Sequence, residues 1–283
     1  MNLNCILLTG MLLIGSFTSV FAAEESFVLL DSSNGGMGIQ AFFSRVLEVD
    51  KAAVLPDNLA VSVKKGDLPV DGALAENCAV VCEDLRKYDS ARFDCAAYGL
   101  LPVVVAVNSD SALESISIED LRRIYSGRVN NWSRLGGADQ KVYIAGSALQ
   151  NAIGRGFRKL VMQQDIYGGK LPDASGLIKP DMLLCRNARA AAAVLQAVPG
   201  TIVFGSWRLA ENKDKKYKVL KINNVEPTLE NIISRRYPLT VEHFLSFNKG
   251  AMPARLPEIM LFLRKNAQKS GVYVVSDIKI EKK

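Results

Sequence analysis

The chain has 283 residues, 49% of them hydrophobic and 23% charged, and its formal net charge is +6 at pH 7. These values exclude a chain too polar to bury a core, and the length suggests one large domain or two modest ones. A basic surface favours anionic partners, from small solutes to nucleic acid or lipid headgroups. Because the lysines and arginines are scattered, solubility alone explains the charge equally well.

Residues 1–22 have the character of a secretory signal peptide. They carry no charged residue, contain an apolar run at 5–13, and end in Val20, Phe21 and Ala22 near the expected cleavage point. The run is short for a membrane span and is interrupted by polar residues and glycine. No later segment could cross a bilayer, so we expect an exported protein, periplasmic or secreted, without a membrane span after cleavage.

In the mature chain, apolar residues recur with the periods of strands and helices in alternation. Strands are expected at 26–31, 59–63, 78–81, 101–107, 142–145, 201–204, 219–222 and 239–247. Helices are expected at 37–50, 83–87, 118–126, 151–160, 186–198, 227–233 and 256–269. This alternation predicts an α/β fold in which helices flank mostly parallel sheet.

The helix that begins at residue 118 has the clearest local signals. Its apolar residues fall at spacings of three and four: Ile118, Leu121, Ile124 and Tyr125. Ser117 is placed to cap its amino terminus, with Asp120 three residues on, and Gly127 is placed to end it. Trp132 follows the helix and is expected to be a packing anchor, as is Trp207.

Four cysteines follow the signal peptide: Cys78, Cys82, Cys95 and Cys185. Cys78 and Cys82 share one face of a single expected strand, about 13 Å apart, which is too far for a bridge between them. If a disulfide forms in an oxidising compartment, Cys95 on a neighbouring strand is the expected partner of one of them. A metal site is the alternative, but the spacings match no zinc pattern and the chain has one histidine.

Two apolar runs, 103–109 and 202–207, are expected to carry the chain between two lobes. The first lobe would then comprise residues 24–104 and 206–283, and the second lobe residues 105–205. A discontinuous lobe of this kind forms a hinged clamshell that closes around a ligand.

Four segments resemble, in the same order, segments of the periplasmic phosphate-binding proteins, the PstS type of the type II periplasmic-binding-protein superfamily. The segments are 102–108, 118–132, 199–204 and 226–239, of which 118–132 ends in Ser-Gly-Arg-Val-Asn-Asn-Trp and 199–204 reads Pro-Gly-Thr-Ile-Val-Phe. The resemblance covers most of the mature chain. It implies a two-lobe clamshell, each lobe a mostly parallel sheet flanked by helices, with a small anion bound in the cleft between the lobes.

The resemblance also implies which residues would contact that anion. They are Ser32, Ser33, Asn34, Gly35 and Cys82 from the first lobe, and Asn151 and Arg155 from the second. A glycine-rich loop that opens a helix can cradle an anion with its free backbone N–H groups. The chain departs from the family pattern in three places. Glu83 stands where a cation is expected, Ser147 replaces an arginine, and 151–153 replace a run of hydroxyl side chains.

The sequence therefore predicts a monomeric solute-binding protein that feeds an ABC importer, with phosphate or a related inorganic anion as ligand. No nucleic-acid partner, cofactor, metal or catalysis is expected. The alternative is a clamshell domain that has lost solute binding and acts through contacts with a protein or with the cell envelope. A secreted hydrolase has little support, because there is no Gly-x-Ser-x-Gly motif and His243, the one histidine, is expected to be structural.

Overall fold

The computed structural model describes residues 25–31, 59–65, 69, 71–82, 89–163, 177–211 and 216–270. The expected signal peptide, the loop at 32–36 and the helices expected at 37–50 and 83–87 lie outside these residues. Within the described ranges, no helix is long and apolar enough to cross a membrane.

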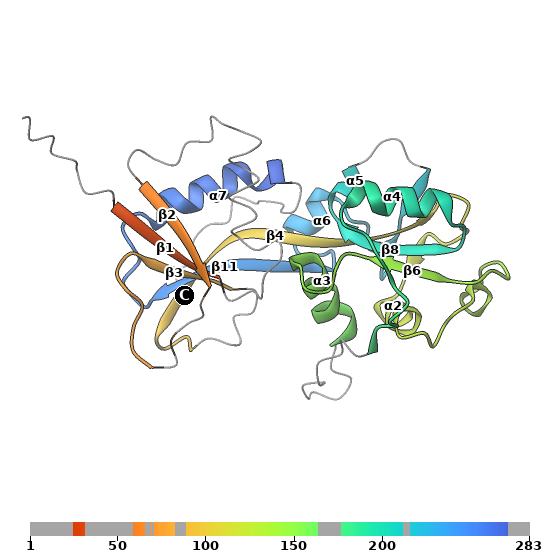
Figure 1. Cartoon of the computed structure of the whole chain (residues 1–283), viewed down its shortest axis with the longest axis horizontal. Coiled ribbons are helices and arrows are strands. Elements are labelled where there is room, and N and C mark those ends of the chain that lie inside the picture. The colour runs from red at the N-terminus through yellow and green to blue at the C-terminus, as the bar shows by residue number, and fades with distance from the viewer. Residues whose placement is uncertain are drawn as a thin grey trace, which may run out of the picture.

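Two groups of parallel strands lie at opposite ends of a continuous sheet, and two long strands join them (Figure 1). The first group consists of β1 (Glu25–Asp31), β2 (Leu59–Lys65) and β3 (Cys78–Cys82). The second consists of β6 (Tyr143–Gly146), β7 (Leu183–Leu184) and β8 (Thr201–Ser206). The joining strands are β4 (Phe93–Asn108) and β11 (Thr240–Asn248). The order across the sheet is β2-β1-β3-β11-β4-β8-β6-β7, and the chain therefore has two lobes.

Within each group the strands are parallel, as their alternation with helices predicted. The joining strands add antiparallel pairs, because β11 runs against β3 and β4, and β4 runs against β8. Strand β4 is 16 residues long, and β11 pairs with its residues 93–102 while β8 pairs with 103–107. The sequence predicted only the second half of β4, because residues 93–100 mix polar and apolar side chains.

Apart from the short helix at 208–211, which the sequence did not predict, the helices of the described chain begin within a few residues of the expected positions. They are α2 (Ile118–Tyr125), α3 (Ala152–Phe157), α4 (Ala188–Ala197), α5 (Arg208–Glu211), α6 (Leu229–Ile233) and α7 (Leu256–Ser270). A π-helical turn, Arg158–Met162, continues α3. Pro227 was expected inside α6, but Thr228 caps this helix by accepting a 3.1 Å hydrogen bond from the Asn231 N–H.

The local signals around α2 are confirmed. The Ser117 hydroxyl accepts a 2.9 Å hydrogen bond from the Asp120 N–H and donates to the Asp120 carboxylate at 2.7 Å. Gly127 follows the helix with φ +79°, which a side chain would disfavour. Trp132 is buried, and its indole N–H donates to the Gly200 carbonyl at 2.9 Å. This anchor ties the segment after α2 to the start of β8.

The sequence predicted a crossing to the first lobe at 202–207, and the structure has strand β8 there. Strand β8 pairs only with β4 and β6, and both belong to the second lobe in this region. Beyond β8, β9 (Tyr217–Val219) pairs with the end of β4, and β10 (Lys221–Ile222) pairs with β5 (Ser115–Ile116). Helices α5 and α6 lie beside the same lobe (Figure 1). Strand β11 follows and pairs with β3 and β4.

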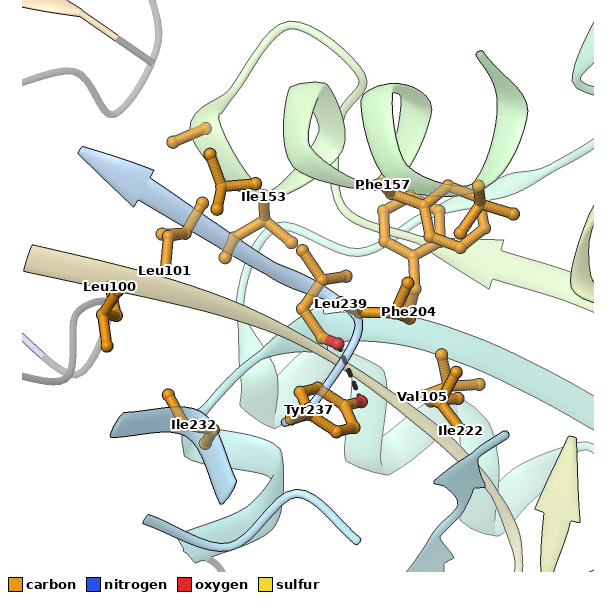
Figure 2. Packing of buried hydrophobic residues seen from close by; sticks show 14 of the residues in the cluster. Leu100, Leu101, Val105, Ile153, Phe157, Phe204, Ile222, Ile232, Tyr237 and Leu239 are labelled. Carbon is orange, nitrogen blue, oxygen red and sulfur yellow. Dashed lines mark hydrogen bonds between the residues drawn. The ribbon is translucent and has the colours of Figure 1, made fainter. Parts of the chain in front are cut away.

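A continuous apolar cluster runs through the joining strands into both lobes. At its centre in the second lobe, Phe157 of α3 stacks on Phe204 of β8 with ring centroids 4.0 Å apart, and Tyr125 contacts both rings edge to face. Figure 2 shows Ile153 and Phe157 on one side of β4, and Tyr237 and Ile232 on the other. Burial of these rings on both sides of β4 makes the joining region part of the core.

The expected bridge to Cys95 is wrong, because β11 lies between β3 and β4. Two strand spacings put the backbone of Cys95 at least about 10 Å from Cys78 and Cys82, beyond the reach of a disulfide. Cys78, Cys95 and Cys185 form no disulfide within the described residues. The Cys95 thiol instead donates to the Ser246 hydroxyl at 3.3 Å.

Candidate functional site between the strand ends

The two groups of parallel strands direct their carboxyl ends toward each other. In the first lobe, β3 ends at Cys82 and β1 ends beside it at Asp31. In the second lobe, β8 ends at Ser206, next to the ends of β6 and β7. Strand β3 is antiparallel to β11, β8 is antiparallel to β4, and β11 and β4 are antiparallel to each other. The carboxyl ends of both groups of strands therefore point to the middle of the molecule. Ligands of α/β proteins bind beyond the carboxyl ends of parallel strands, which makes this region the candidate site.

The register of the strand pairs gives the distance between the carboxyl ends of the first-lobe strands and those of the second-lobe strands. Cys82 is level with Ala97 of β4, through Phe244 of β11, and Ser206 is level with Val103. The stretch of β4 between Ala97 and Val103 spans about 20 Å at roughly 3.3 Å per residue. A small anion is much narrower than this span, so the segments that follow the strands must provide its contacts.

The predicted contact residues of the first lobe begin at this edge. Ser32, Ser33, Asn34 and Gly35 follow Asp31, the last residue of β1, and themselves lie outside the described residues. Cys82 is the last residue of β3, and its side chain is not among those described. The residues that follow β1 and β3 therefore begin at the edge of the sheet where the candidate site lies. Their contacts with an anion stay a prediction.

Asn151 and Arg155 belong to the segment that follows β6 in the second lobe. The Asn151 side-chain oxygen accepts a 2.9 Å hydrogen bond from the Gly154 N–H and so caps α3. Its NH₂ group keeps its donors for other partners. The Arg155 guanidinium is half-buried and donates to the Gln150 carbonyl at 2.6 Å. This bond holds the arginine against the loop that leads into α3.

The first turn of α3 is packed into the core. Ala152 and Ile153 are each 1% exposed, and Figure 2 shows Ile153 on the same side of β4 as Phe157. A side chain on Gly154 would place its Cβ 2.2 Å from the Ala148 carbonyl oxygen. Apolar side chains therefore stand where the resemblance implies hydroxyl groups, and only backbone N–H groups and the two flanking polar residues can meet an anion there.

Sequence reasoning missed three arginines beside the ends of β7 and β8. Arg186 directly precedes Asn187, which caps α4 three residues after the end of β7, and Arg189 is the second residue of α4. Arg208 opens α5 after β8. All three side chains are exposed. The sequence predicted a helix at 186–198 and gave these arginines no role, because only the alignment of the ends of β6, β7 and β8 brings them to one edge.

Cys185 lies between β7 and these arginines. It is 5% exposed, and its N–H donates to the Gly146 carbonyl at 2.8 Å. Burial raises the pKa of its thiol, so the group is neutral at physiological pH and adds no negative charge to the edge. Its position helps to hold β7 against β6.

His243 lies in β11 opposite Gly99 of β4, one residue before Phe244, which pairs with Cys82 at the end of β3, and it is 2% exposed. Its Nδ1 atom is 3.3 Å from the Tyr98 hydroxyl, and the two rings meet edge to face. This packed position agrees with the structural role expected for it. Trp207 packs against the apolar clusters on both sides of the second-lobe sheet, as expected for an anchor.

A hollow of about 360 Å³ lies at the opposite ends of β6 and β8. Its walls include Val129, Tyr143, Val194 and Thr201, which stand at or near the amino-terminal ends of those strands. It is therefore separate from the candidate site, and its walls are mostly apolar.

Two lobes, two joining strands and facing strand ends define a two-lobe binding protein. The chain belongs to the PBP (periplasmic-binding-protein) superfamily, because the sequence model of the PBP superfamily domain matches residues 90–264. It is similar to the phosphate-binding protein PstS of Bacillus subtilis, with 25% identity over 212 residues that cover 72% of this chain. The match spans 65% of the length of that relative.

Solved structures share the fold at low sequence identity. An ABC-type phosphate transport receptor from Vibrio cholerae matches with a TM-score of 0.65 and 16% identity, covering 88% of this chain and 100% of that one. PstS from Borrelia burgdorferi matches with a TM-score of 0.63 and 14% identity, covering 88% of this chain and 98% of that one. The two-lobe fold and the resemblance to PstS-type proteins are thus confirmed.

Proposed function

We propose that the protein is an exported solute-binding protein of the phosphate-importer type, which binds a small anion between its lobes without chemical change. The observation that carries the proposal is the meeting of two sets of strand ends across β4 and β11. Phosphate is the first candidate, because the relatives carry names of phosphate-binding proteins. A periplasmic or secreted monomer that delivers its ligand to an ABC permease completes the proposal.

The proposed lobes follow the path of the joining strands. The second lobe comprises about residues 103–239, and the first comprises the residues before 103 and after 239. This division moves the return crossing from 206 to the start of β11. The hinge then consists of one β4–β11 pair, whose register runs from Thr240 opposite Pro102 to Asn248 opposite Phe93.

In the proposed mechanism, the anion contacts both lobes and thereby stabilises the closed arrangement. Arg155 supplies a positive charge and Asn151 a neutral donor from the second lobe. The first lobe supplies backbone N–H groups of the loop 32–36 and the segment after Cys82. A dianion taken from water needs several such donors, at least one of them charged.

Calorimetric titration with phosphate, arsenate and sulfate tests the proposal. We expect heat with a stoichiometry of one for at least one anion. The Arg155→Gln variant should bind that anion about tenfold more weakly, since it loses a charge-assisted hydrogen bond. The control is Arg236→Gln, which removes an exposed arginine paired with Glu230, and should bind as the wild type does. Binding that is unchanged in Arg155→Gln contradicts the proposed site.

The second candidate function is a clamshell that no longer binds solute. The buried Ala152 and Ile153 favour it, because they occupy the turn where an anion would need donors. Absence of heat with every oxyanion, together with a stable 1:1 complex with a defined partner protein, is the result expected from this alternative.

A further inference from the structure

The hollow at the amino-terminal ends of β6 and β8 has the size of a ligand pocket. Its volume of about 360 Å³ falls within the range of small-molecule sites, roughly 300–1,000 Å³. It lies beside the edge of the sheet, where β7 pairs with β6 only from Ala145 onward. The candidate anion site lies at the other end of β6, so a ligand in the hollow would not touch it.

The walls of the hollow are mostly apolar and come from three parts of the second lobe. They are formed by α2 and the residues after it, by α4, and by the edge strand, through Ile124, Val129, Val194, Val198 and Leu183. Leu183 is 50% exposed, and Tyr143, which also lines the hollow, is 44% exposed. Water therefore meets large apolar side chains here, and covering them with an apolar group is favourable.

A backbone donor of β6 faces the hollow. The Tyr143 N–H donates to the Gly200 carbonyl at 3.2 Å, on the side of β8. Because the N–H groups of successive strand residues point to opposite sides, the Ile144 N–H points to the side of β7. Strand β7 begins opposite Ala145, one residue further on, and Ile144 lines the hollow. An acceptor group that enters the hollow would satisfy this donor.

The charged side chains of the lining favour an anionic acceptor. They are Lys141, Lys179 and Asp181. The Lys179 Nζ atom is 3.1 Å from the Asp181 carboxylate, so these two charges largely cancel. The Lys141 Nζ atom lies over the Tyr143 ring, 5.0 Å from its centroid, and no carboxylate of the described residues pairs with it. One positive charge therefore remains beside the apolar walls.

We propose that this hollow is a second ligand site, which binds a small apolar carboxylate, that is, a monocarboxylate anion with an aliphatic or aromatic body. The body packs against the walls supplied by α2, α4 and Leu183. The carboxylate accepts a hydrogen bond from the Ile144 N–H. Lys141 is three residues before Ile144, about 10 Å along the strand, and its flexible four-carbon stem brings the ammonium group toward the same carboxylate. Binding is non-covalent and does not depend on an anion between the lobes.

Calorimetric titration of the full chain with sodium octanoate and with 1-octanol tests the proposal, because the two probes share an apolar body and differ in charge. The wild type should bind one octanoate, and should bind 1-octanol about fivefold more weakly, the upper range for one exposed ion pair. Octanoate binding should be unchanged by saturating phosphate. Absence of octanoate binding, equal affinity for the two probes, or displacement of octanoate by phosphate overturns the proposal.

Two variants place the probe in the hollow. Val194→Trp, at a half-buried position of α4, fills the space and should weaken octanoate binding at least about tenfold. Its control is Leu229→Trp, which adds the same bulk at an exposed position of α6 and should bind octanoate as the wild type does. Equal affinity in Val194→Trp and the wild type contradicts the site.

The charge is tested at the surface, where folding is not at risk. Lys141→Gln should weaken octanoate binding about fivefold and leave 1-octanol binding unchanged. The control is Arg236→Gln, which removes one positive charge from a residue outside the lining and should leave octanoate binding unchanged. Equal weakening in the two variants shows only a general effect of net charge and overturns the proposed contact with Lys141.

Discussion

Helices α3 and α4 begin alike and meet different surroundings. Each is capped by an asparagine, Asn151 or Asn187, whose side-chain oxygen accepts a 2.9 Å hydrogen bond from the N–H three residues on. In α3 the first turn is Ala152 and Ile153, both buried against the core. In α4 Arg186 directly precedes the cap and Arg189 is the second residue of the helix, and both are exposed.

The difference shows that a capped helix start beside a strand end does not by itself identify a ligand site. The cap satisfies one backbone N–H in both helices. In α3 the side chains of the first turn pack into the core, while in α4 the first turn carries an exposed, charged arginine. The macrodipole favours anions at both helix starts. In α4 an arginine, Arg189, stands at the second helical position, whereas in α3 the arginine, Arg155, stands at the fourth.

The largest effect should come from the glycine in the first turn of α3. Gly154→Ala puts a Cβ 2.2 Å from the Ala148 carbonyl oxygen and 2.5 Å from the Leu149 Cα, and both are backbone atoms that cannot turn aside. We expect a loss of about 2 kcal/mol in the free energy of unfolding, measured by urea denaturation.

The matched change in α4 is Ala190→Gly, since Ala190 occupies the same position after its cap. It should cost about 0.5–1 kcal/mol through helix propensity alone. If Gly154→Ala proves neutral or stabilising, the tight contact between the start of α3 and the loop before it does not exist.

An intermediate effect is expected at the joining strands on which α3 rests. The buried Tyr237 hydroxyl donates to the Val103 carbonyl at 3.0 Å from the other side of β4 (Figure 2). Tyr237→Phe leaves this carbonyl without its donor, and should lower the free energy of unfolding by about 1–2 kcal/mol at pH 7. Tyr143→Phe, at a tyrosine that is 44% exposed, is the control and should change stability little.

The same variant should alter stability in alkali. Burial raises the pKa of Tyr237 well above its ordinary value near 10. The unfolded state therefore loses the phenolic proton above pH 10 while the folded state keeps it, so stability falls as the pH rises. In Tyr237→Phe this fall should be shallower by about 1.4 kcal/mol per pH unit, measured by urea denaturation between pH 10 and 11.5. If the free energy of unfolding falls equally steeply with pH in the wild type and in Tyr237→Phe, the Tyr237 hydroxyl is not protected from ionisation by burial.

The smallest effect should come from the two caps. Asn151→Ala and Asn187→Ala should each lower the free energy of unfolding by about 1 kcal/mol, because each leaves one backbone N–H without a partner. Their effects on anion binding should differ if Asn151 also donates to the ligand. Thermal unfolding measures the loss of stability in both variants, and calorimetric titration measures their affinity for the anion. An equal loss of affinity in the two variants contradicts a contact between Asn151 and the ligand.

Most elements of the described chain could be predicted from local patterns. The α2 helix is one example, because its apolar spacing, its Ser117–Asp120 cap and Gly127 are all consequences of backbone geometry within a few residues. Strand β4 was only half predicted, since its first half is a mixed sequence whose burial depends on β11, which lies far away in the chain. The proposed return at the start of β11 differs from the crossing expected at 202–207 for the same reason.

The candidate site also has features that local sequence predicts and features that depend on distant pairings. The sequence by itself determined that an α/β protein forms and that Asn151 begins a helix after a strand, because these follow from hydrophobic period and capping. Two lobes were implied by the expected crossings and by the resemblance to periplasmic phosphate-binding proteins. Only the tertiary structure decided that Ala152 and Ile153 are buried and that Arg186 and Arg208 stand at neighbouring strand exits. Burial and proximity depend on strand order and register, and these are set by pairings between segments that are distant in the chain.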